Sequence, residues 1–176
     1  MKQLRLLSVQ IIWLNWGLTH HDLATLPAGV QRGFLKDTLQ STTSSIQPYT
    51  GLGSDLGGTK GRCLFAGSWN ADIYPPLKAH VQPSDLHCAK NRMSGLWRDG
   101  QPLYKALKKE GKRTLLFTGV NTDQCVLGTL TNAYNEGWNC VLIDDCCGTK
   151  TVGGKEVTFY NVAVSGFSLF NDEGWK

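Results

Sequence analysis

A chain of 176 residues is long enough for one domain with a real hydrophobic core, and is short for two. Hydrophobic residues make up 41% of it and charged residues 18%, which excludes a disordered chain and a membrane-embedded one. The net charge of +4 is too small to indicate nucleic acid as a partner. We therefore expect a single domain over residues 1–176, with no nucleic-acid partner and no membrane partner.

The first apolar segment of the chain has the composition of a buried strand. Residues 9–14 are rich in β-branched and aromatic side chains. Lys2 and Arg5 precede this segment as in a signal peptide, but no small-x-small cleavage site follows it. The segment is also far shorter than the ~18 residues that a membrane span needs. After this strand, a helix is expected over residues 27–39.

The next segment, residues 48–61, is rich in glycine and invites comparison with phosphate-binding loops. A P-loop has a lysine before Ser or Thr, whereas Lys60 follows Thr59. The dinucleotide fingerprint also fails, because Leu56 stands where its third glycine should be. We expect a flexible surface loop or lid over residues 51–61, and no nucleotide.

The second half of the chain alternates between strand and helix patterns. Residues 114–120 open with a continuous apolar run, which is typical of a strand covered on both faces. The other expected strands cover residues 86–89 and 139–143, and the expected helices cover residues 101–110, 123–136 and 157–164. Crossovers of this size join parallel strands in right-handed βαβ units. The predicted class is α/β with a mostly parallel sheet.

Histidine and cysteine residues are not arranged as metal ligands. Asp85 and His87 have a ligand-like spacing and should share one face of a strand, but no third donor is near, so a polar pair is the simpler interpretation. The six cysteines include no CxxC pair, and the chain is too long to need disulfides for its stability. We expect no metal, no other cofactor, and a reducing compartment such as the cytoplasm.

Cys125 is the one cysteine in a position that favours chemistry. It follows the strand that ends at Val120 and lies in the first turn of the next helix, where the helix dipole favours a thiolate. Ligands of open α/β sheets bind at the carboxyl ends of such strands. The alternative is a buried structural cysteine, and position alone does not decide between the two.

Four tryptophans leave a similar choice between lining a pocket and filling the core: Trp13, Trp16, Trp69 and Trp97.

Residues 118–126, TGVNTDQCV, resemble the cysteine motif of the isochorismatase-like hydrolases, in which a strand and a Gly-Val turn lead into a helix. Residues 90–96, KNRMSGL, resemble the family's Lys-x-x-x-Ser-x-Phe element, with Leu96 in place of Phe. The resemblance extends over about residues 9–165 and implies a three-layer α/β/α fold. It also implies a homo-oligomer that acts on a small-molecule substrate.

The family's site consists of a Cys, a Lys and an Asp. Carried over, Cys125 is the nucleophile and Lys90 is the cation that stabilises its thiolate. The backbone at Val120 and Asn121 resembles the family's cis-peptide turn, which contributes with Cys125 to an oxyanion hole. The expected reaction is the hydrolysis of a small amide or a related compound. Nicotinamidases of this superfamily also bind a metal through one Asp and two His, and residues 15–22 lack that spacing.

The third member of the family's site, an Asp at the end of a leading apolar strand, has no counterpart in this chain. We therefore expect a chain that lacks the usual first strand and is incomplete at its N-terminus. The loss of a general base costs ~10²–10⁴-fold in rate. Two functions stay open: a cysteine hydrolase of small amides, and a non-catalytic protein that keeps the fold for binding or interaction.

Overall fold

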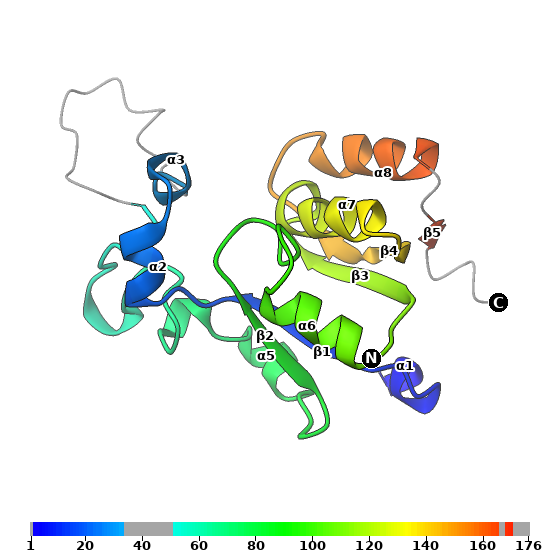
Figure 1. Cartoon of the computed structure of the whole chain (residues 1–176), viewed down its shortest axis with the longest axis horizontal. Helices are drawn as coiled ribbons and strands as arrows, with labels where there is room; N and C mark the ends of the chain where they lie inside the picture. The colour runs from blue at the N-terminus through cyan, green and yellow to red at the C-terminus, as the bar shows by residue number, and fades with distance from the viewer. Residues whose placement is uncertain (1, 34–50, 166–167, 171–176) are drawn as a thin grey trace. The chain divides into compact units, whose positions relative to one another are not determined.

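The computed structural model describes residues 2–33, 51–165 and 168–170. The chain divides into two compact units, Met1–Arg92 and Met93–Lys176, which are described separately below (Figure 1). The expectation of one domain over residues 1–176 stays a prediction.

The first unit contains a two-stranded parallel sheet, in which β1 (Ile12–Trp16) pairs with β2 (Leu86–Lys90). The strand expected over residues 9–14 thus begins later than predicted. The reason is that Val9 donates its backbone N–H to Leu4 at the end of the first helix, so the chain extends only beyond it. The short helices of this unit are α1 (Lys2–Leu6), α2 (His20–Thr25), α3 (Ala28–Gln31) and α5 (Pro75–Lys78), with 3₁₀ turns η1 (Gly58–Lys60) and η2 (Trp69–Ala71).

A small apolar core lies beyond the end of β1. It consists of Leu18, Leu26 and Leu52, which are 0%, 5% and 1% exposed. Leu52 belongs to the glycine-rich segment, so the surface loop predicted over residues 51–61 is wrong for its first four residues. The buried Leu52 side chain and backbone hydrogen bonds to Gln31 and Cys63 hold them. Glycine at position 53 allows this packing because a Cβ there would lie 2.4 Å from the Leu23 side chain.

The helix predicted over residues 27–39 is shorter than expected. α3 ends at Gln31, and the N–H of Gly33 closes a turn onto the carbonyl of Val30. Glycine in a helix interior costs about 0.5–1 kcal/mol relative to alanine, which favours an end at this point. Residues 34–39 of the prediction lie outside the described residues.

The second unit is an α/β/α arrangement around a parallel sheet of order β3-β4-β5. Figure 1 shows α7 and α8 on one side of β3 and α6 on the other. The predicted α/β class with parallel strands is confirmed. The elements of this unit are β3 (Thr114–Val120), β4 (Asn139–Gly148), β5 (Ser168–Phe170), α6 (Pro102–Lys109), the π-helical turn η3 (Thr122–Val126), α7 (Leu127–Asn135) and α8 (Gly154–Val164).

β4 is twice as long as the strand predicted over residues 139–143. Its pairing with β3 changes register after Phe117, so that Gly119 lies opposite Cys147 and Val120 opposite Gly148. Such irregularities bend a strand and increase its twist. This one allows β4 to follow β3 to its carboxyl end, where the candidate site begins.

Candidate active site

The turn that carries Cys125 follows β3 directly. The peptide bond between Val120 and Asn121 is cis, the geometry that the family resemblance implies at this point. The next residues form a π-helical turn, in which the N–H of Val126 bonds the carbonyl of Asn121 at 3.2 Å. The helix predicted over residues 123–136 therefore begins with a wider turn than expected, and regular α7 starts only at Leu127.

Hydrogen bonds from α7 and from the segment that precedes α6 hold this turn. Thr129 donates its hydroxyl to the carbonyl of Cys125 at 2.7 Å and accepts the N–H of Gly95 at 3.1 Å. The buried Thr129 thus connects the backbone of Cys125, the nucleophile candidate, to a second segment of the unit. Sequence reasoning missed Thr129, because its spacing of four from Cys125 is also that of an ordinary helix neighbour.

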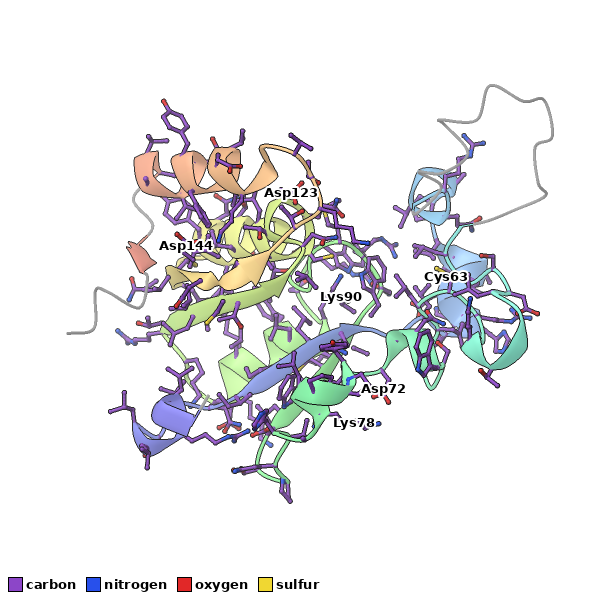
Figure 2. The ribbon with its side chains drawn as sticks, turned by 180° about the vertical axis from the view of Figure 1, so that it is seen from behind. Cys63, Asp72, Lys78, Lys90, Asp123 and Asp144 are labelled. Atoms are coloured by element: carbon purple, nitrogen blue, oxygen red, sulfur yellow. The ribbon has the colours of Figure 1, made fainter. Side chains whose placement is uncertain are left out.

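On its other side, the turn is held through Asp123, which Figure 2 labels. Thr149, just after β4, donates its hydroxyl to Asp123 Oδ1 at 2.5 Å. The backbone of Gly154 at the start of α8 approaches the same carboxylate closely. The turn with Cys125 is therefore fixed by β3, by α7 and by the loop between β4 and α8.

The cysteines differ in burial. Cys125 is half-buried and Cys146 is exposed, whereas Cys88, Cys140 and Cys147 are buried. Burial raises the pKa of Cys140 to about 11, and burial is also the largest cause that raises the pKa of Cys147 to about 11. None of the six cysteines, all of which lie in the described part of the chain, is paired in a disulfide. Cys125 and Cys146 are therefore better placed for reaction than the three buried thiols.

In the first unit, the candidate site residue Lys90 lies at the carboxyl end of β2. Figure 2 labels Lys90, the last residue of β2. It is only 4% exposed. The Lys90 ammonium lies 3.8 Å from the centroid of the Trp16 ring and donates to the carbonyl of Arg92 at 2.8 Å. Trp16 is partly buried and also packs against the core around Leu18.

The residue after Lys90 is held from α2. Asn91 donates its amide to Asp22 Oδ1 at 2.6 Å, while the hydroxyl and N–H of Thr19 bond the other oxygen of Asp22. Burial raises the pKa of Asp22, but these hydrogen bonds outweigh it and leave the pKa below its usual value. Thr19 and Asp22 form a capping box, and their spacing of three is the sequence signal for this contact.

The residues compared with the nicotinamidase metal site do not fit a metal. The ring of His20 packs edge-on against Phe65 at 4.9 Å, and Asp22 is occupied by Thr19 and Asn91. In the described ranges, no group of three or more His, Cys, Asp or Glu side chains is arranged to hold a metal ion. That the chain binds no metal stays a prediction.

The predicted polar pair of Asp85 and His87 is wrong. His87 is exposed, whereas Asp85 is buried and accepts hydrogen bonds from the two terminal nitrogens of the Arg5 guanidinium, at 2.6 and 2.8 Å. The indole N–H of Trp13 donates to the same carboxylate at 2.8 Å. Alternation fails because Asp85 precedes β2 and does not follow its pleat.

A comparison with protein-family models identifies the family of this chain. The family model described as the isochorismatase domain matches residues 42–168. The chain belongs to the isochorismatase domain family. The resemblance carried by residues 118–126 is thereby confirmed.

Three similar proteins show how much of the chain the similarity in sequence and structure covers. The ureidoacrylate amidohydrolase RutB of Variovorax paradoxus (strain S110) is 32% identical over 105 residues, which are 58% of this chain and 39% of that protein. An isochorismatase family protein from Desulfovibrio vulgaris subsp. vulgaris str. Hildenborough superposes with a TM-score of 0.70 at 18% identity, over 96% of this chain and 74% of that one. This likeness supports the isochorismatase fold alone.

The third is the YcaC gene product from Escherichia coli, an octameric hydrolase of unknown specificity. It superposes with a TM-score of 0.51 at 26% identity, over 58% of this chain and 49% of that one. The match to the RutB relative covers well under half of that protein's length.

Within the described residues, none of the helices combines the length and the apolar character that crossing a bilayer requires.

Proposed function

We propose that this isochorismatase domain is a cysteine hydrolase of small amides, with Cys125 as the nucleophile and Lys90 as the cation that stabilises its thiolate. The observation that carries the proposal is the position of the Cys125 thiol. It is half-buried and lies in the first turn after the cis bond between Val120 and Asn121, at the carboxyl end of β3. The name of the RutB relative, an amidohydrolase, supports an amide as the substrate.

In this proposal, the Cys125 thiolate attacks the carbonyl carbon of the amide. A carbon–sulfur bond forms, and the carbonyl oxygen becomes an oxyanion held by the backbone around Val120, Asn121 and Cys125. The carbon–nitrogen bond then breaks, and ammonia or an amine leaves with the proton that the Cys125 thiol gave up on becoming a thiolate. Water hydrolyses the resulting thioester, which releases a carboxylic acid and regenerates the thiol.

The test is ammonia release from a panel of small primary amides and ureido compounds, ureidoacrylate among them. We expect the wild type to hydrolyse at least one of them, and Cys125→Ala to lose about 10³-fold or more in rate. Cys146→Ser removes an exposed thiol from β4 of the same unit and serves as the matched control, with an unchanged rate. Equal rates for wild type and Cys125→Ala on every compound would instead favour a non-catalytic binding protein.

Two further properties belong to the same proposal. The octameric assembly described for YcaC supports a homo-oligomer, which light scattering of the purified protein tests. Six free cysteines support a reducing compartment such as the cytoplasm. A monomer in solution would overturn the first of these, and oxidised cysteines in protein taken directly from cells would overturn the second.

A further inference from the structure

Trp16 and Lys90 are the last residues of neighbouring strands and are register partners in the parallel sheet of the first unit. Side chains of paired residues on adjacent strands stand on the same face of a sheet. The indole ring and the ammonium group therefore meet because of the pairing of β1 with β2. A shift of register by one residue would separate them.

The contact has the geometry of a strong cation–π interaction. The Lys90 ammonium lies 3.8 Å from the centroid of the Trp16 ring, well inside the limit of ~6 Å for such contacts. Tryptophan is the best of the aromatic partners, and the attraction is greatest when the cation is withdrawn from water. Lys90, at 4% exposed, meets that condition.

A second contact restricts the same ammonium group. It donates to the carbonyl of Arg92 at 2.8 Å, and this carbonyl belongs to the chain immediately after β2. That chain is itself held from α2, because Asn91 donates to Asp22 at 2.6 Å. An indole face and a backbone carbonyl thus limit where a flexible four-carbon side chain can carry its charge.

We infer that Trp16 is the positioning residue for Lys90: its ring holds the ammonium group in place at the carboxyl end of β2. The inference rests on the proposed function, in which this ammonium stabilises the Cys125 thiolate. Trp16 also packs against the core of Leu18, Leu26 and Leu52, so its loss affects folding as well. The test must therefore separate the aromatic ring from the apolar volume.

The variants Trp16→Phe and Trp16→Leu make that separation, because both side chains are apolar and of similar volume but only phenylalanine has an aromatic face. We expect Trp16→Leu to lower kcat/KM for the amide substrate about tenfold, and Trp16→Phe to recover most of the loss. Trp69→Leu removes a tryptophan that is 67% exposed and serves as the control, with kcat/KM unchanged. Thermal unfolding checks that each variant is folded.

The second readout does not depend on activity. In protein labelled with ¹³C at the lysine Cε, we expect the ring current of Trp16 to shift the Lys90 resonance upfield of ordinary lysines, and Lys90→Met identifies it. The shift should vanish in Trp16→Leu and persist in Trp16→Phe. A folded Trp16→Leu variant with wild-type kcat/KM overturns the inference, and so does a Lys90 resonance that does not move. If the wild type is no faster than Cys125→Ala, the proposed function fails instead, and the resonance tests the ring contact alone.

Discussion

The carboxylate of Asp123 lies directly against the backbone of Gly154, the first residue of α8. A Cβ at position 154 would lie 2.9 Å from Asp123 Cγ and 2.8 Å from the Cβ of Thr151, distances that real side chains do not adopt. The same carboxylate accepts the Thr149 hydroxyl at 2.5 Å. Because Asp123 belongs to the turn that carries Cys125, glycine at 154 is what allows α8 to approach this turn.

Gly154→Ala is therefore expected to push α8 and the turn apart. We predict a loss of about 2 kcal/mol in the free energy of unfolding, as for other overpacked sites, together with slower alkylation of Cys125. Gly29→Ala in α3 is the matched control, since no atom lies within 4 Å of the Cβ that it would add. It should leave the alkylation rate unchanged and stabilise slightly. Equal unfolding curves for the two variants would contradict the close approach seen at Gly154.

The buried carboxylate of Asp85 predicts a dependence of stability on pH. Hydrogen bonds from Arg5, the largest cause, hold the pKa of Asp85 far below its ordinary value of 3.8, and those from Gln82 and Trp13 act in the same direction. A carboxyl group whose pKa is lower in the folded state than in the unfolded state stabilises the fold at pH values above its unfolded pKa. This contribution is lost progressively as the pH falls below about 4.

Thermal unfolding of the wild type and of Asp85→Asn between pH 7 and pH 2 measures this contribution. Asp85→Asn should lower the melting temperature at pH 7 by roughly 5 °C. The difference in stability between wild type and variant should then shrink steadily below pH 4. Asp99→Asn, at an exposed position, should follow the wild type throughout. A difference that stays constant down to pH 2 would mean that Asp85 does not titrate in this way.

The elements that the sequence predicts best are those whose signal is local. The strand over Thr114–Val120 has the predicted bounds, because a continuous apolar run needs no distant partner to be recognised. The length of β4 depends instead on a register change against β3. The burial of Leu52 depends on Leu18 and Leu26, which are far from it in the sequence. Neither could be predicted from a window of neighbouring residues.

The same distinction applies to the site. The position of Cys125, after a strand and at the start of a helix, follows from local patterns, and the structure has both elements in that order. Its supports could not be predicted, since Thr129 and Thr149 are ordinary polar residues until tertiary contacts bring them to the turn. The ring contact of Trp16 with Lys90 depends on strand register, which no sequence pattern specified.

The buried thiols should react more slowly than the accessible ones. With limiting iodoacetamide at pH 7.5, we expect Cys146 and Cys125 to be labelled first and Cys140 and Cys147 last. Burial keeps the reagent away from Cys140 and Cys147, and it raises their pKa values so that little thiolate forms. Peptide mass spectrometry measures each site separately, and unfolding in urea should equalise the rates. The exposed Cys146 is the internal standard: if Cys125 is an activated nucleophile, its rate should exceed that of Cys146. Labelling of Cys140 as fast as Cys146 in folded protein would refute the burial order.

Thr122, the first residue of the π-helical turn, is fully buried, and its hydroxyl has no hydrogen-bond partner among the described residues. A buried hydroxyl left without a partner costs about 1–3 kcal/mol. Thr122→Val keeps the shape and removes the polar atom, so we predict a gain of about 1 kcal/mol in the free energy of unfolding. Thr129→Val is the matched control, because the equally buried Thr129 hydroxyl bonds both Cys125 and Gly95. That variant should lose about 1–2 kcal/mol. Denaturant unfolding of both variants should therefore give changes of opposite sign in the free energy of unfolding. A loss of stability in both variants would mean that the Thr122 hydroxyl has a hydrogen-bond partner in the native protein.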